Sequence, residues 1–379
     1  MTDEIARGLE GVTVAETRLS SIDGDEGELI IGGFPLAELA GNATFEETVF
    51  LLREDRLPDE GELASFRADL ASRRGIEPET RETLRAAAQR ELPAMDALRM
   101  GVAAANLGDD AGESGDPETD SLTAIAVLPT IVATYWRCRQ GAEPVEPRTD
   151  LGHAANYLYM LEGEVPDDAA VRGLETYLNG VVDHGLNAST FTARCIVSTE
   201  SDVFSAVTGA VGALKGPLHG GAPGPVLDML LDIHESGDPA AAVHERLDAG
   251  ERLMGFGHRV YSVRDPRAAV LSEAAESFYA DAGNADFFES AREAERVGAE
   301  ALAEHRPDLN LETNVEFYTA VLLHGIGIPR ELFTATFGVA RVGGWTSHCL
   351  EQLSDNKIVR PRARYVGDEG REWTAVGER

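Results

Sequence analysis

The chain has 379 residues, more than one simple core usually holds, so we expect two domains. Its hydrophobic share of 43% is ordinary for a globular protein, but its formal net charge of −33 is not. Such an acidic surface repels nucleic acid and anionic lipid, which argues against both as partners. The acidic residues are spread along the chain, so we favour adaptation of the whole surface to high salt over a binding site for a polycation.

The cysteines and the N-terminus indicate a reducing compartment. Cys138, Cys195 and Cys349 are widely separated and odd in number, which predicts neither a disulfide framework nor a zinc site. The N-terminal sequence contains no apolar signal core, so we expect a cytoplasmic protein. The longest apolar stretch, 122–136, is interrupted by Pro129 and by threonines and is shorter than the roughly 20 residues that a membrane span needs. We expect it to be a buried helix.

Helical periodicity dominates from residue 35 onward, and the expected fold class is mainly α. Before that point, 12–15 and 28–31 read as short strands or extended segments around a turn at 23–25. Thr44 followed by Glu47 has the pattern of a capping box and predicts a helix start. Further helices are expected at 59–74, 77–90, 93–107, 121–140, 150–162, 167–183, 188–200, 202–215, 225–235, 238–250, 266–282, 286–305, 313–325 and 330–352.

Three segments interrupt this pattern. Residues 108–120 are rich in Gly and Asp and predict a polar surface loop. Residues 216–224 are dense in Gly and Pro and are the best candidate for a hinge between domains. The tail from Arg360 is basic and then polar, and we expect it to be extended.

Two histidines lie among glycines, His219 within 216–222 and His258 within 255–261. Glycine lets the backbone turn sharply or approach a ligand closely, and a neutral imidazole can donate or accept a proton near pH 7. One such segment could be a turn with a satisfied side chain, but two in one chain favour a functional site. His184 is a third histidine beside a glycine. Asp183 before it could orient the loop, and Asn187 after it could cap the next helix.

Four further charged residues stand out. Asp265-Pro266 has the pattern of a helix start, so Arg267 is placed where a helix N-terminus favours an anion, although an ordinary surface arginine fits equally well. Glu316 lies beside Val and two aromatic residues at a helix start, where burial would raise its pKa and suit it as a base; the competing interpretation is a charge that complements the helix dipole. Arg341 lies on an apolar, glycine-containing helix, where a charge is usually paired or binds a ligand. Arg360 alone reads as tail charge.

The remaining histidines have no comparable setting. They form no HxxxH or HxH pair, so we expect no metal site. These residues are His153, His234, His244, His305, His324 and His348.

Taken together, the motifs resemble the citrate synthase family, especially its archaeal and bacterial type I-like members, over nearly the whole chain. The matching segments are Gly8–Val12, Ile22–Gly24, Phe45–Glu47, His153–Leu161, Asp183–Phe191, the two glycine-histidine segments, Asn314–Tyr318, the helix around Trp345, and Ile358–Tyr365.

The resemblance implies condensation of acetyl-CoA with oxaloacetate and water to citrate and CoA, a reaction of the tricarboxylic acid cycle, with no cofactor besides the CoA thioester as co-substrate. It implies that His219 donates to the thioester oxygen, that His258 polarises the ketone of oxaloacetate, and that Glu316 is the base. His184, Arg267 and Arg341 match oxaloacetate ligands, and Arg360 matches an arginine supplied across the interface of a homodimer. It also implies a large helical domain (1–221 and 325–379) and a smaller domain (222–324) that closes over the substrates.

The chain departs from the family pattern at three positions. The family's base is Asp in Asn-Val-Asp-Phe-Tyr, and Glu316 moves the carboxylate outward by one bond of roughly 1.5 Å. Pro223 stands where the family usually has Asn, and Ser262 stands at a position near CoA that is often basic, for which Arg264 is a possible substitute. Two alternatives therefore stay open: a 2-methylcitrate synthase that uses propionyl-CoA, and an impaired paralogue that binds CoA or oxaloacetate without turnover.

Overall fold

The computed structural model describes residues 5–105, 115–220, 223–258, 260–282, 285–306, 309 and 311–379. Most of the predicted loop at 108–120 lies outside the described residues, as do Gly221 and Ala222 of the His219 segment and Arg259 of the His258 segment.

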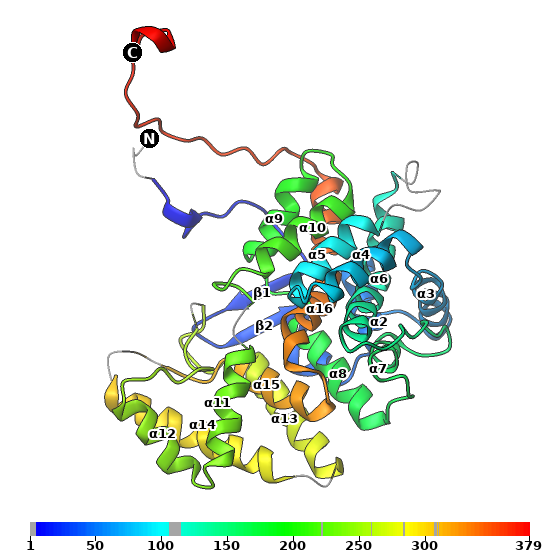
Figure 1. Cartoon of the computed structure of the whole chain (residues 1–379). Helices are drawn as coiled ribbons and strands as arrows, with labels where there is room; N and C mark the ends of the chain where they lie inside the picture. Colours follow the sequence, from blue (N-terminus) through cyan, green and yellow to red (C-terminus); the bar gives the residue numbers. More distant parts are fainter. Residues whose placement is uncertain are drawn as a thin grey trace.

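Helices make up most of the described chain, which confirms the expected fold class (Figure 1). They are α1 (Leu36–Ala40), α2 (Phe45–Glu54), α3 (Glu60–Ser72), α4 (Pro78–Gln89), α5 (Ala94–Ala104), α6 (Pro117–Arg139), α7 (His153–Glu162), α8 (Asp168–Val181), α9 (Ala188–Val197), α10 (Val203–Leu214), α11 (Pro223–Glu235), α12 (Pro239–Asp248), α13 (Pro266–Ala282), α14 (Ala285–His305), α15 (Val315–Ile326) and α16 (Phe333–Ser354). Short 3-10 turns occupy Arg7–Leu9, Arg330–Leu332 and Val376–Glu378.

A small antiparallel sheet precedes the helices. β1 (Ser20–Asp23) pairs with β2 (Glu28–Ile31), with Ser20 opposite Ile31, and β2 pairs with β3 (Phe34–Pro35). The predicted strand at 28–31 and the turn at 23–25 are therefore confirmed, whereas residues 12–15 form no strand.

Two helices begin inside segments that the sequence predicts as irregular. α6 begins at Pro117 and not after residue 120, because the Asp116 carboxylate accepts hydrogen bonds from the backbone N–H groups of Glu118 and Thr119 and Pro117 stands at the first helical position. α11 likewise begins at Pro223, within the segment predicted as a hinge. In both cases proline marks the first helical turn rather than the preceding loop.

The apolar stretch at 122–136 is part of α6, which runs for 23 residues. Length and composition alone would let this helix cross a membrane, but 72% of its most apolar window is buried inside the protein. α6 packs against α4, α5, α7 and α16, as a core helix does, which confirms the predicted buried helix.

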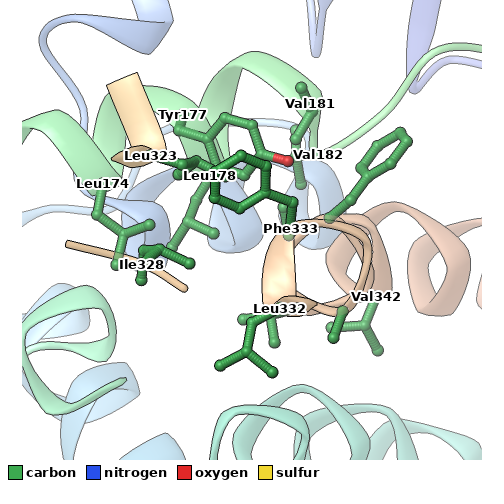
Figure 2. Close-up of a cluster of buried hydrophobic side chains, with 14 of the residues drawn as sticks. Leu174, Tyr177, Leu178, Val181, Val182, Leu323, Ile328, Leu332, Phe333 and Val342 are labelled. Atoms are coloured by element: carbon green, nitrogen blue, oxygen red, sulfur yellow. The ribbon is translucent and has the colours of Figure 1, made fainter. Parts of the chain in front are cut away.

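The centre of the fold is the contact between α8 and α16. α16 is buried on every side from Phe333 to Cys349 apart from Thr334, and its sequence there is mostly apolar, with Arg341 and His348 as buried exceptions. Figure 2 shows side chains of α8 and of the α15–α16 connection, including Tyr177 and Phe333, packed into one cluster. This packing fixes the C-terminal end of α8, from which the chain enters the turn at Asp183 and His184.

The helices α11 to α14 and the two termini lie at opposite ends of the view in Figure 1. α11, α12, α13 and α14 gather at the lower left of Figure 1, with α15 between them and the larger group. The N-terminal segment and the tail after α16 both extend from the upper part of the molecule. The tail is extended and exposed from Arg360 to Trp373, as predicted.

Candidate active site

His219 lies in the turn after α10, half-buried, and its Nε2 is 2.8 Å from the Ser189 hydroxyl. That hydroxyl also accepts a hydrogen bond of 3.0 Å from Nε1 of Trp345 on α16. Burial, followed by the positive charge of Arg341, lowers the pKa of His219 to about 4. The imidazole is therefore neutral at pH 7 and able to donate a hydrogen bond without carrying a charge.

His258 follows a turn that needs glycine, since Gly255 and Gly257 have φ of +88° and +79°. Its Nδ1 accepts hydrogen bonds from the backbone N–H groups of Val260 (3.1 Å) and Tyr261 (3.2 Å). The neutral ring consequently carries its hydrogen on Nε2. Burial and the nearby Arg267 lower the pKa of His258, which favours this neutral form.

His184 follows α8, and its Nε2 is 3.0 Å from the hydroxyl of Tyr261. The rings of His184 and His258 meet edge to face with centroids 5.9 Å apart, and Tyr261 lies against both. Burial, and then the charges of Arg267 and Arg341, hold the pKa of His184 well below its usual value. The turn after α8 and the turn before α13 thus bring two neutral imidazoles together.

Arg267 is buried, so its interpretation as a surface arginine is wrong. Its guanidinium makes a two-point contact with Asp265, with Nε–Oδ1 and NH2–Oδ2 distances of 3.0 and 2.7 Å. Asp265 also accepts from the backbone N–H of Val315 at 3.2 Å, which ties α13 to the start of α15. The NH2 group lies 3.3 Å from Nε2 of His258. Two donors therefore face the same small region, and an oxygen of a ligand would satisfy both.

Arg341 is only 1% exposed, on the buried face of α16. Its Nε donates to the carbonyl of Val181 at 2.6 Å, and its guanidinium carbon lies 4.7 Å from the centre of the Phe337 ring. Its NH2 nitrogen is buried and has no hydrogen-bond partner among the described residues. Burial lowers the pKa of Arg341 to about 10, although Asp183 opposes the shift. A buried donor without a partner is the strongest local sign of an anionic ligand.

Glu316 lies in the first turn of α15, where Asn314 caps the helix by accepting from the Glu316 N–H at 3.0 Å. The Asn314 side chain also donates to the carbonyl of Gly257 at 2.8 Å, so the Glu316 helix and the His258 turn are joined directly. Burial raises the pKa of Glu316 to about 7, although Arg267 lowers it. A carboxyl group with a pKa near 7 is suited to act as a base at neutral pH.

Arg360 is the one predicted site residue that the structure does not bring to this cluster. It lies exposed in the extended tail beyond α16 (Figure 1). The other six come from six pieces of chain: the turns before α13 and after α8 and α10, and the helices α13, α15 and α16.

His348, for which the sequence alone indicates no role, lies seven residues after Arg341 on α16 and is fully buried. Its Nε2 is 3.2 Å from Oδ1 of Asp183, the residue before His184. A histidine two helical turns from a functional arginine shares its helix face, and that spacing is the signal that could have found it.

The cluster combines buried arginines, neutral imidazoles and a carboxyl group that titrates near pH 7. Arginines bind carboxylates, neutral imidazoles polarise carbonyl groups, and such a carboxylate can remove a proton from a weak carbon acid. Among the described residues, no group of three or more His, Cys, Asp or Glu is arranged to hold a metal ion.

Comparisons with known proteins place this cluster in a family. The family model described as citrate synthase, C-terminal domain, matches residues 8–362. The chain is 42% identical to the citrate synthase of Haloferax volcanii over the full length of both chains. It is 34% identical to the 2-methylcitrate synthase of Shewanella oneidensis, covering 98% of this chain and 97% of that one.

Solved structures agree. Citrate synthase from Pyrobaculum aerophilum superposes with a TM-score of 0.89 at 36% identity, covering 98% of this chain and 95% of that one. A ternary complex of the Thermoplasma acidophilum citrate synthase with carboxymethyl coenzyme A and oxaloacetate superposes with a TM-score of 0.87 at 30% identity over the whole of both chains. With sequence, fold and the clustered motif residues in agreement over the full length, this chain belongs to the citrate synthase family.

Proposed function

We propose that the chain condenses acetyl-CoA with oxaloacetate and water to give citrate and CoA. The observation that carries the proposal is the convergence of Arg267 and Arg341, both buried, on a region that also contains Glu316 with its raised pKa. A dicarboxylate would supply an acceptor for the buried Arg341 NH2 group, which has no hydrogen-bond partner among the described residues, and a further acceptor for Arg267. The chain is 42% identical to the Haloferax volcanii citrate synthase and 34% identical to the Shewanella 2-methylcitrate synthase, a difference that favours acetyl-CoA as the thioester.

Each residue has one role in this proposal. Glu316 removes a proton from the methyl group of acetyl-CoA while the N–H of His219 gives its proton to the thioester oxygen, which yields the enol. The enol carbon attacks the ketone of oxaloacetate, whose oxygen is polarised by the Nε2–H of His258 and then protonated. His184, Arg267 and Arg341 hold the two carboxylates. Water finally hydrolyses the thioester and releases CoA.

Glu316 is the weakest match to the family pattern. A displacement of about 1 Å can lower a rate on the order of 100-fold, so the longer side chain must be compensated for the base to work well. The Asn314 cap fixes the Glu316 backbone at the start of α15, and Arg267 and Arg341 are near enough to lower the pKa of its carboxyl group against the effect of burial. We take it as the base.

The assembly and the location are part of the same proposal. Arg360 lies outside its own cluster, which supports a homodimer in which it reaches the partner's site. The chain divides into a large domain (1–221 and 325–379) and a small domain (222–324) that closes to exclude water. The three cysteines are unpaired, which is compatible with the cytoplasm. The reaction needs no cofactor beyond the CoA thioester.

The test is release of CoA, followed with a thiol reagent at molar KCl, with oxaloacetate and either acetyl-CoA or propionyl-CoA. Fast, oxaloacetate-dependent release from acetyl-CoA is the expected result. A strong preference for propionyl-CoA would move the activity to 2-methylcitrate synthesis. Binding of oxaloacetate without release from either thioester would leave only the impaired paralogue.

A further inference from the structure

A buried network behind the substrate-facing residues centres on Asp183, whose side chain is completely buried. Its Oδ2 accepts hydrogen bonds from the hydroxyl of Ser20 and from the backbone N–H of Gly185 (3.3 Å), and its Oδ1 faces Nε2 of His348 at 3.2 Å. A buried carboxylate is stable only when donors of this kind replace water.

The protonation of His348 follows from its other neighbour. Its Nδ1 lies 3.0 Å from NH1 of Arg194, and the same NH1 donates to Oε2 of Glu351 at 2.7 Å. Arginine can only donate, so Nδ1 of His348 must accept and carries no hydrogen. The hydrogen of the neutral ring is then on Nε2 and points at Asp183.

Close packing keeps this network in place. A Cβ added to Gly344 would lie 2.3 Å from the carbonyl oxygen of Val182 and 2.8 Å from Oδ1 of Asp183. α16 can therefore approach the turn after α8 this closely only because residue 344 has no side chain.

Asp183 in turn acts on two residues that face the substrate. Its carboxylate and the Ser20 hydroxyl both accept from the N–H of Gly185. The residues immediately before and after His184 are therefore joined by these hydrogen bonds. Of the neighbouring charges, Asp183 raises the pKa of Arg341 the most, so it is the main counter-charge of that buried guanidinium.

We propose that His348 is a positioning residue: through Asp183 it orients His184 and stabilises the charged Arg341, and so sets the affinity for a dicarboxylate substrate. This inference rests on the proposed condensation for the identity of that substrate. His348 itself touches neither the substrate nor the reacting atoms.

Charged groups face the pair formed by Asp183 and His348 from two helices, α9 and α16. Arg341 and Glu351 face it from α16, and Arg194 faces it from α9, while Ser20 contributes a hydroxyl from β1. Burial alone would raise the pKa of Asp183, but His348 and Arg341 lower it below its usual range. Removal of the His348 donor should therefore move protonation of Asp183 to higher pH.

The experiment compares full-length His348→Leu and His348→Gln with wild type, and uses Ser347→Ala as the matched control. Ser347 is a buried neighbour whose hydroxyl bonds only within α16, to the Gly343 carbonyl. In His348→Leu we expect the KM for oxaloacetate to rise about tenfold or more while the KM for acetyl-CoA stays within about twofold. His348→Gln keeps an N–H donor for Asp183 and should recover most of the affinity. Ser347→Ala should match wild type.

A second readout is the Kd of oxaloacetate against pH, measured by calorimetry. In His348→Leu the weakening of binding on the acid side should begin at higher pH than in wild type, because Asp183 protonates more readily. Equal losses for both substrates, or an unchanged pH profile, would overturn the inference. If His348→Leu does not fold, Ser20→Ala removes another donor to Asp183 and must show the same acid-side shift. Calorimetry measures binding and needs no turnover. If the wild-type protein released no CoA, the proposed function would be wrong, but the oxaloacetate affinities would still test the role of His348.

Discussion

At the scale of single residues, burial disfavours the charged forms of both an acidic and a basic residue of the site. Burial raises the pKa of Glu316 to about 7 and lowers the pKa of Arg341 to about 10, so each group is less stable in its charged form than it would be in water. A bound dicarboxylate balances the positive charge of Arg341, whereas Glu316 remains a base with its pKa near the working pH.

We predict that Glu316→Gln lowers kcat by about 100-fold or more, because the amide cannot accept the methyl proton. In wild type, kcat/KM for acetyl-CoA should fall as the pH drops below about 7, since protonated Glu316 is inactive as a base. Steady-state rates across pH test both statements. Activity of Glu316→Gln close to wild type would exclude Glu316 as the base.

The same substitution should affect stability with a defined sign. The folded pKa of Glu316 is raised from 4.5 to about 7, so its favourable contribution to stability is complete below pH 4.5 and is lost as the pH rises from there through about 7. Gln resembles the protonated form at every pH. The Tm of Glu316→Gln should therefore match wild type near pH 4 and exceed it by about 2 °C or more at pH 8, by calorimetry.

Gly344→Ala should disrupt the site from inside the core. The added Cβ would overlap backbone and carboxylate atoms at 2.3 and 2.8 Å, so α16 and the 183–185 turn must separate. We expect a loss of about 1–3 kcal/mol in unfolding free energy, with weaker oxaloacetate binding. The control is Gly61→Ala in α3, where the new Cβ would meet only Asp59 Oδ1 at 3.4 Å; this variant should be neutral or slightly stabilised.

Residue-level prediction from the sequence worked where the partners are close along the chain. Asn187 and Asp265 accept from backbone N–H groups two or three residues ahead, as their local patterns predict. The pairing of His348 with Asp183 spans 165 residues, and no local pattern contains it. The burial of Arg267 is also a property of the assembled fold.

At the scale of elements, helix starts depend on specific caps. The predicted capping box at α2 is present: Thr44 accepts from the Glu47 N–H, and the Glu47 carboxylate accepts from the Thr44 N–H at 2.8 Å. α3 begins with an equivalent box formed by Asp59 and Glu62.

Thr44→Ala should reduce the unfolding free energy by about 1 kcal/mol, because both reciprocal bonds depend on the cap geometry. The matched control is Thr83→Ala, in the middle of α4 and away from its ends. Its hydroxyl lies at the protein surface and bonds only to the Glu79 carbonyl one turn earlier. Alanine is the better helix former there, so this change should be neutral or stabilising. Urea unfolding of both variants in high salt measures the difference, and equal effects would contradict a capping role.

Element prediction was accurate along the periodic segments and less so at their ends. α13 was predicted with its observed bounds, because Asp265-Pro266 marks its start, whereas α6 extends earlier than its apolar pattern does. The first turn of α6 is polar, and its start is set by Asp116 and Pro117 rather than by hydrophobic periodicity.

At the scale of the whole molecule, the net charge of −33 produces self-repulsion that salt must screen. We predict that the protein loses helical signal and activity when KCl is reduced from molar to about 10 mM, where the screening length reaches about 30 Å. Circular dichroism during dialysis tests this. A full signal without added salt would contradict it.

The proposed dimer makes a stricter prediction. Arg360→Ala and Glu316→Gln should each be inactive as homodimers. A mixed dimer with one chain of each kind should recover one intact site, because the Glu316→Gln chain supplies Arg360 to the partner that retains Glu316. Activity after co-expression and isolation of mixed dimers, through two different affinity tags, measures this. Absence of recovery would mean that Arg360 acts within its own chain or not at all.

The fold class and the family could be predicted from the sequence because they depend on periodicity and on motifs spread over the whole chain. The extended form of the tail was also predicted, from its basic and then polar composition. In the proposed homodimer the tail would lie against a second molecule, and the sequence pattern of one chain does not describe that contact.

The burial of α16 has a further consequence for ligand linkage. This helix carries Arg341 and is enclosed from Phe333 to Cys349 apart from Thr334, so an unfolded chain cannot retain the binding site. Oxaloacetate should bind the native state alone, and at about 100 times its Kd it would add about 2.7 kcal/mol to the unfolding free energy. Thermal protection by oxaloacetate would therefore report an occupied site even in variants that have lost all turnover.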